Sequence, residues 1–291
     1  MSAYLSITQA KIWLFHVKTQ PSVYSPLCMN LVREICLYLT CHHLLPCIQD
    51  SVFRLHDFES GHVITSGVPI SYSKGASFCL YTPEFVLCVG DAQPSGVTYD
   101  LNVKSYRMDR LGDLQEARQW VGVVSYGLYV YVFGGNINPS IRSVEKFDTR
   151  RKGWLPVPSM IHERCCFTPT EYFGLIYLIE PCARNYPIEA FSPAAETYRT
   201  CGVSFKAYSY GVISFVDKDS IVILQFAGKV HRWKVGAAEL ETAKLKWQDQ
   251  DFAVSVCPPI RVETAVYWIS YRSKRLVKYE IQGGNASVGR L

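Results

Sequence analysis

The sequence predicts an all-β protein built from consecutive, similar groups of antiparallel strands. Three observations support this class. Short runs of alternating β-branched and aromatic residues are separated by glycine, proline or aspartate, most clearly over residues 128–164. One of these strands recurs along the chain at a nearly constant spacing. The 291 residues, 48% of them hydrophobic and 13% aromatic, are enough to bury the core of one large all-β domain.

Residues 128–164 contain the most complete set of these features. In chain order they are a strand (Leu128–Phe133), a glycine pair (Gly134 and Gly135), a second strand (Ser143–Phe147), Asp148, a basic turn ending at Gly153, then Trp154 and Arg164. A glycine pair at the end of a strand permits positive φ and a close approach of neighbouring backbone. The segment therefore predicts antiparallel strands joined by sharp turns.

The first strand of this segment recurs upstream and downstream. The residue at its end is, along the chain, Gly90, Gly134, Glu180, Gln225 and Ser270, at intervals of 44 to 46 residues. The strand that follows also recurs, at 96–103, 142–148, 188–194, 229–233 and 275–281. A fixed period of this length is typical of repeat proteins, in which each unit needs neighbours to bury its faces.

Residues 128–164 resemble a Kelch repeat, which forms one blade of a β-propeller. The resemblance implies that Trp154 packs between blades, that Asp148 forms a turn and that Arg164 joins neighbouring blades. By period it covers residues 50–290, but only this copy has the full set. The preceding copy keeps one glycine, Gly90, and the later copies lack the pair.

The repeat spacing also predicts the number of blades. Residues 52–63 align with 144–155 at twice the period, which predicts the third and fourth strands of a blade within 52–67. We therefore expect six blades, with five as the alternative, and a propeller domain over 51–291. The last copy is expected to end in a glycine-rich tail without an outer strand. Lys11–Val17 is expected to complete that blade and hide the open edges.

The segment 1–50 contains a second pattern. Leu27, Leu31, Ile35 and Leu39 are four residues apart, which places them on one face of a helix. Together with Pro26 and Leu44–Leu45, this order resembles a short F-box, which implies docking on an adaptor of a ubiquitin ligase. A helix that caps the propeller, or a degenerate blade with a strand at Ile35–Cys41, fits the same residues.

Composition and motifs exclude several classes. The net charge of +5 is spread along the chain, which predicts no nucleic-acid platform, and no apolar run is long enough to cross a membrane. Eleven scattered cysteines without a secretory signal predict reduced thiols in a cytoplasmic protein. Cys41–His43 with Cys47 matches no common zinc spacing, so no metal site is predicted. Nucleotide-binding and hydrolase motifs are absent, so no cofactor and no enzyme activity are expected.

Function is expected in the loops at one face of the propeller. In antiparallel blades, the loops from strand two to strand three emerge beside the connections to the next blade, and loops on a rigid scaffold commonly carry recognition. The predicted partner-binding residues in these loops are Asn136, Asn138, Arg184, Asn185, Tyr186 and Arg272. Arginine and tyrosine are favoured interface anchors, so the expected partner is a protein that presents an acidic or polar peptide.

The leading hypothesis is a non-catalytic protein-interaction scaffold. One alternative is an F-box and Kelch type substrate receptor of a ubiquitin ligase. Another is an enzyme that uses the central cavity. The strands taken as innermost, 85–89, 129–133, 176–179, 221–224 and 266–269, contain no carboxylate or histidine, which counts against an enzyme.

Overall fold

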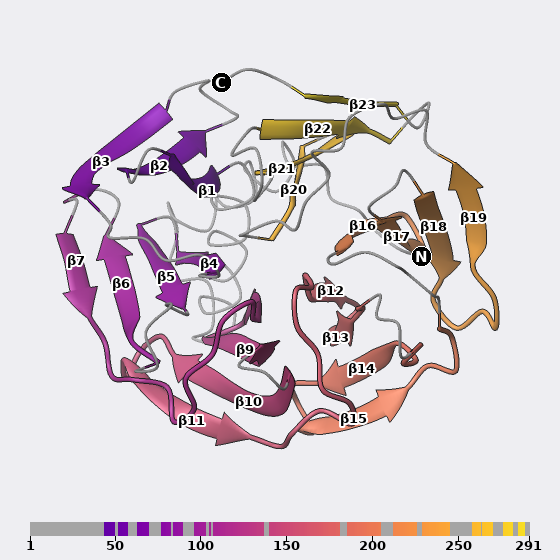
Figure 1. Ribbon diagram of the computed structural model, residues 1–291, viewed down its shortest axis with the longest axis horizontal. Coiled ribbons are helices and arrows are strands. Elements are labelled where there is room, and N and C mark those ends of the chain that lie inside the picture. The colour runs from indigo at the N-terminus through magenta and orange to yellow at the C-terminus, as the bar shows by residue number, and fades with distance from the viewer. Residues whose placement is uncertain are drawn as a thin grey trace, which may run out of the picture.

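A computed structural model shows a ring of antiparallel sheets around a central axis (Figure 1). The secondary structure of the described residues consists of strands, without a helix. The described residues are 44–49, 52–57, 63–69, 77–82, 84–89, 96–102, 105, 107–136, 140–180, 185–204, 212–225, 229–244, 258–262, 264–269, 276–281 and 285–288. The fold is thus an all-β propeller, as the sequence predicts.

Five sheets have four strands each, and we call them the first to fifth blades. The first blade contains β4 (Ser77–Thr82), β5 (Phe85–Val89), β6 (Thr98–Asn102) and β7 (Arg107–Arg110). The second contains β8 (Gly122–Tyr126), β9 (Tyr129–Asn136), β10 (Ser140–Asp148) and β11 (Gly153–Val157). The third contains β12 (Thr170–Tyr172), β13 (Leu175–Leu178), β14 (Glu189–Ser192) and β15 (Thr197–Thr200).

The last two blades repeat this order. The fourth blade contains β16 (Val212–Asp217), β17 (Ser220–Gln225), β18 (Lys229–Lys234) and β19 (Glu241–Lys244). The fifth contains β20 (Ile260–Val262), β21 (Ala265–Ile269), β22 (Leu276–Glu280) and β23 (Asn285–Val288). Five complete blades is the number that the sequence analysis gave as its alternative to six.

A three-stranded sheet, the N-terminal sheet, stands between the fifth blade and the first. It contains β1 (Leu44–Gln49), β2 (Val52–Asp57) and β3 (Val63–Pro69), and β1 lies beside β4 and β21. Strands β2 and β3 lie where two strands were predicted, over 52–67, but they are the second and third strands of a three-stranded sheet rather than the third and fourth of a blade. Leu44 and Leu45, which belong to the F-box-like pattern, lie in a strand. The rest of that pattern, including Leu27, Leu31, Ile35 and Leu39, lies outside the described residues.

The expectation that the last blade ends without an outer strand is wrong. The outer position of the fifth blade is occupied by β23, which pairs antiparallel with β22 from Val277–Val288 to Glu280–Asn285. Strand β23 was not predicted from the sequence because it is short and follows Gly283 and Gly284. Lys11–Val17 lies outside the described residues, and the edge assigned to it is already paired.

The strands taken as innermost are in fact the second strands of their blades. The innermost strands are β4, β8, β12, β16 and β20 (Figure 1). Two of them carry carboxylates, Glu171 in β12 and Asp217 in β16. Asp217 is buried, accepts a hydrogen bond from Arg232 at 2.7 Å and forms an ion pair with Arg261 at 3.3 Å. The pair with Arg232 lies within the fourth blade, and the pair with Arg261 of β20 joins the fourth blade to the fifth.

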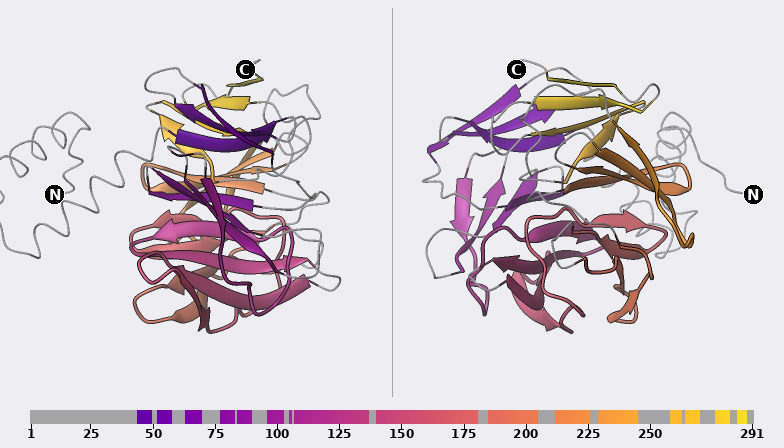
Figure 2. Two further views of the ribbon diagram at one scale, coloured as in Figure 1. Left: turned by 90° about the vertical axis from the view of Figure 1, so that its left-hand side faces the viewer. Right: turned by 45° about the vertical axis from the view of Figure 1, so that its right-hand side comes forward.

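The burial of each strand follows from its distance from the axis. Every residue of β17 is buried, whereas β7 and β15 have mostly exposed side chains. A strand between two neighbouring blades is covered on both faces, so its sequence is apolar throughout, while an outer strand faces solvent. Shared hydrophobic clusters therefore join the blades: Leu87 packs with Val132, and Trp268 packs with Leu224. Figure 2 shows the ring from two further sides, with the indigo N-terminal sheet beside the yellow fifth blade.

Charged side chains also join neighbouring blades near the turns between the third and fourth strands. Lys152, in the turn of the second blade, donates to Asp100 of the first blade at 2.6 Å. Glu196, at the equivalent turn position of the third blade, accepts from Lys146 of the second. Lys152 and Glu196 both have positive φ, 55° and 53°. The two junctions thus use the same positions with opposite charges.

Candidate partner-binding face

One face of the ring gathers the loops for which binding was predicted. Because the strands of each blade are antiparallel, the connections between the second and third strands emerge beside the connections from one blade to the next. In the second and third blades this face carries Ser140, the segment 158–169 and the residues before β14. The hairpins between first and second strands, and the turns between third and fourth, lie on the opposite face.

The glycine pair at the end of β9 is held against the connection to the third blade. Gly134 has φ +58° and Gly135 has φ +130°. A Cβ atom on Gly134 would lie 2.2 Å from the carbonyl oxygen of Arg164, and one on Gly135 would lie 2.9 Å from Cβ of Arg118. The amide of Gly135 donates to the carbonyl of Arg164 at 2.9 Å. Both glycines are therefore required by conformation and by space.

A buried arginine on each side of the second blade anchors this face. Arg164 is fully buried and donates to Oε1 of Glu189 at 2.9 Å and to the carbonyl of Pro187. Arg118, also buried, donates to Oε1 of Glu145 at 2.8 Å. Arg164 was predicted from the sequence to join neighbouring blades, whereas Arg118 and both glutamates were not predicted. The two arginines are 46 residues apart and the two glutamates are 44 apart, and this match to the repeat period is the signal that could have found them.

The Arg164–Glu189 pair orients the side chain of His162. Oε1 of Glu189 lies 2.9 Å from Nδ1 of His162, and its carboxylate accepts the backbone amides of Ile161 and His162. The ring of Tyr186 stacks on His162 with 4.4 Å between centroids, and its hydroxyl donates to Glu163 at 3.2 Å. The result is a preorganised aromatic surface whose base is a buried ion pair.

Two exposed residues border this stack. Asn185 is exposed and has φ 55°, in the left-handed region that asparagine tolerates. Ile161 is 41% exposed, which is unusual for a large aliphatic side chain. We call Ile161, His162, Asn185 and Tyr186 the 161–186 patch. It combines an apolar side chain, two stacked rings and an amide.

The structure does not describe the side chains of the other predicted binding residues. Asn136 is the last residue of β9, and its side chain is not among those described. Asn138, Arg184 and Arg272 lie outside the described residues, as does Gly90 of the repeat signature. Of the six predicted binding residues, the structure thus describes the surroundings of Asn185 and Tyr186. Ile161 and His162 were missed because they lie in a connection between blades, where the strand period gives no signal.

The remaining signature residues form the body of the second blade. Trp154 of β11 donates from Nε1 to the carbonyl of Gly112 at 2.9 Å and packs with the cluster shared by the first two blades. Oδ1 of Asp148 accepts the amides of Arg150 at 2.9 Å and Arg151 at 3.0 Å. These amide donors, that of Arg151 foremost, lower the pKa of Asp148. Both residues are placed to stabilise the scaffold.

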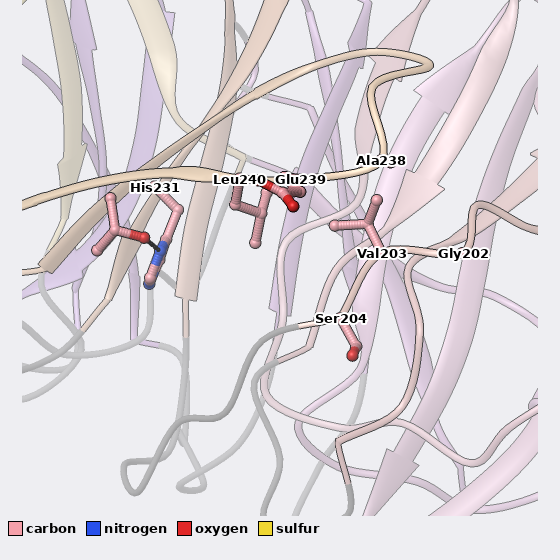
Figure 3. A pocket seen from close by; sticks show the side chains of 8 residues that line it. Gly202, Val203, Ser204, His231, Ala238, Glu239 and Leu240 are labelled. Carbon is pink, nitrogen blue, oxygen red and sulfur yellow. Dashed lines mark hydrogen bonds between the residues drawn. The ribbon is translucent and has the colours of Figure 1, made fainter.

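An open hollow lies at the junction of the third and fourth blades (Figure 3). Its volume is about 490 Å³, and its lining residues are Gly202, Val203, Ser204, His231, Ala238, Glu239, Leu240 and Thr242. Nδ1 of His231 lies 2.8 Å from Oγ1 of Thr242, and Nε2 lies 3.1 Å from Oε1 of Gln225. Because both ring nitrogens are engaged within the blade, His231 serves the fold at this place.

The described residues contain neither a candidate metal cluster nor a candidate membrane-spanning helix. These residues contain no group of three or more histidine, cysteine, aspartate or glutamate side chains placed to hold a metal ion. Among the same residues, no helix is long and apolar enough to span a membrane.

Comparison with known proteins agrees with the architecture. A family model described as the Kelch motif matches residues 121–161, which run from β8 past β11 and so cover all four strands of the second blade. No curated protein matches the chain. The motif that matches is the blade with the glycine pair, Asp148 and Trp154.

Proposed function

We propose that this β-propeller, with its Kelch motif in the second blade, is a non-catalytic scaffold that binds a protein partner through the loop face. Kelch propellers generally serve interaction rather than catalysis, which supports the class of function. The observation that carries the proposal is the 161–186 patch, in which Glu189 holds His162, and Tyr186 packs on His162 and donates to Glu163. Rigid aromatic side chains provide contact area at low entropic cost.

The chemistry of the patch suggests the kind of partner. Ile161 and Tyr186 would bury apolar surface, while Asn185 offers an exposed amide that can bond to an extended peptide backbone. Arg184 and Arg272, from the predicted loops, would add cationic groups for an acidic or polar peptide. The partner we propose is therefore a protein segment with an apolar anchor and acidic neighbours.

The location we propose is the cytoplasm. Among the residues whose side chains the structure describes, Cys79, Cys88, Cys165, Cys166 and Cys201 are free thiols. Reducing compartments keep thiols in this state, whereas oxidising ones favour disulfides.

A photo-crosslinking residue placed at position 185 tests the binding face. In cells, it should give a discrete adduct with one protein, and the same residue at position 173, on the opposite face, should not. The partner identified in this way is then purified, and its Kd is measured with the full chain. Tyr186→Ala should raise the Kd at least tenfold, while Phe173→Ser should leave it unchanged. Equal effects of the two substitutions would refute the proposed face.

A more specific version is a substrate receptor of a ubiquitin ligase. It is supported by the four-residue spacing of Leu27, Leu31, Ile35 and Leu39, which is that of an apolar helix face able to enter a groove. Binding of the full chain to a purified ligase adaptor tests it. A Leu31→Asp and Ile35→Asp double variant should lose adaptor binding and keep the Kd for the loop-face partner. If the unsubstituted chain shows no adaptor binding, this version is wrong and the scaffold proposal stands.

A further inference from the structure

Two adjacent cysteines lie in the connection between the second and third blades, directly after Arg164. Cys165 is buried, and Cys166 is half-buried with φ 56°. The amide of Cys166 donates to the carbonyl of Trp120 at 2.8 Å, which fixes the backbone of the pair. Adjacent thiols held by a residue of positive φ are an unusual arrangement for a structural core.

Polar groups from two other parts of the chain lie beside the sulfur of Cys165. The hydroxyl of Ser140, at the start of β10, donates to Sγ at 3.7 Å, and Oε1 of Glu180, after β13, lies 3.9 Å from Sγ. Oε2 of Glu180 is buried and has no hydrogen-bond partner. Glu180 occupies the position in the repeat that Gly134 holds in the preceding blade. A side chain with a carboxyl group is therefore present where that blade has a glycine.

The ionisable groups around Cys165 favour its thiolate. Hydrogen bonding from Cys166, with a further bond from Ser140, lowers the pKa of the Cys165 thiol. The same bond, with burial, raises the pKa of Cys166. Burial raises the pKa of Glu180 to about 8, against the opposing effect of the Arg164 guanidinium. Glu180 can therefore hold the proton that Cys165 gives up.

We propose that Cys165 and Cys166 form a peroxide-sensitive thiol pair, in which Cys165 is the nucleophile, Glu180 the proton carrier and Cys166 the resolving thiol. The thiolate of Cys165 attacks one oxygen of hydrogen peroxide and the O–O bond breaks. The hydroxide that leaves takes the proton of Glu180 and becomes water. Cys166 then attacks Sγ of the sulfenic acid, the S–O bond breaks, and a second water leaves with the proton of Cys166.

The chain contains its own matched control for this reaction. Cys201 is half-buried, like Cys166, but burial raises the pKa of its thiol. Cys79 and Cys88 are buried within the first blade. A thiol whose pKa lies near neutral pH has far more thiolate than an ordinary one, although each thiolate is less nucleophilic, so a net advantage of about tenfold is expected.

The experiment treats the reduced full chain with hydrogen peroxide at pH 7, then blocks free thiols and maps each cysteine by mass spectrometry. Cys165 should lose its free thiol about ten times faster than Cys201. The tryptic peptide 165–184 also contains Cys182, so a Cys182→Ser variant is used and fragmentation locates the bond. The expected product is a peptide lighter by two hydrogens, with the disulfide between residues 165 and 166.

Two variants separate the proposed roles. Cys166→Ser should stop the reaction at a sulfenic acid on Cys165, which a dimedone probe traps. Glu180→Gln should slow oxidation of Cys165 several-fold without changing that of Cys201. Oxidation of Cys201 as fast as Cys165, pairing of Cys165 with Cys182 in the unsubstituted chain, or an unchanged product in Cys166→Ser would each overturn the proposal. None of these measurements requires the partner of the loop face.

Discussion

Gly134 and the carbonyl oxygen of Arg164 approach so closely that a Cβ atom on the glycine would lie 2.2 Å from that oxygen. Strand β9 of the second blade meets the connection to the third blade at this contact, because Gly134 lies near the end of β9 and Arg164 lies between β11 and β12. The amide of Arg164 also donates to the carbonyl of Ile141 at 3.3 Å. The glycine of the Kelch motif is therefore a packing requirement between blades as well as a turn residue.

Gly134→Ala should lower the free energy of unfolding by about 3 kcal/mol or more, because backbone must move to admit the new methyl group. Gly127→Ala is the matched control. Gly127 has a similar φ of +59° with no atom within 4 Å of the added Cβ, so its cost should be about 1 kcal/mol, from conformation alone. Urea titration of both variants measures the difference, and equal losses would show that contact with Arg164 does not matter.

Removing one partner of the buried Arg164–Glu189 pair should lower the free energy of unfolding more than expected from replacing both partners together. Both side chains are fully buried, so Glu189→Gln or Arg164→Met alone should cost about 3–5 kcal/mol by leaving a buried charge without its partner. The double variant Arg164→Met and Glu189→Met should cost less than the sum of the two single variants. A strictly additive double variant, measured by chemical denaturation, would contradict a direct coupling.

The Lys152–Asp100 pair should couple the first and second blades. Nζ of Lys152 also lies 4.5 Å from the ring centroid of Phe85, so the charge has both an anionic and an aromatic partner. Because Lys152 is about two-fifths exposed, we expect a modest loss of about 1 kcal/mol for Lys152→Ala. A double-mutant cycle with Asp100→Asn measures the coupling, and exchange of the two charges in Lys152→Asp with Asp100→Lys should recover part of it.

His231 should make stability depend on pH. Burial, with the nearby Lys229, lowers its pKa, so the folded chain resists protonation that the unfolded chain accepts. The contribution of His231 to the free energy of unfolding is fully present above pH 6.5, the ordinary pKa of histidine. This contribution is lost as the pH falls toward the lower pKa that His231 has in the folded state. His231→Gln should reduce the slope of the unfolding free energy below pH 6.5. His162→Gln, on the surface patch, serves as the comparison.

The period of the chain was sufficient to predict the architecture, because each blade repeats one buried strand. The second strands, such as β17, are apolar on both faces and give the strongest signal, which is also why they were mistaken for the innermost ones. Strand β12 has three residues, and a strand so short carries almost no periodicity. The outer strand β23 was missed for the same reason.

The candidate site was less predictable than the fold. Tyr186 and Asn185 could be named because they follow a recurring strand, and loops at that place commonly bind partners. His162 lies in a connection between blades, and its role depends on Glu189, 27 residues away in the third strand of the next blade. Contacts of this kind arise when blades pack, so strand patterns within one repeat do not contain them.

The opposite polarity of the two turn contacts gives the ring an order. Lys152 meets an aspartate on the blade before it, whereas Glu196 meets a lysine on the blade before it. If the third blade followed the first directly, Glu196 would face Asp100 and two carboxylates would repel each other. A chain with its blades in a different order would thus be penalised at this junction, so these few side chains help to determine which blade follows which.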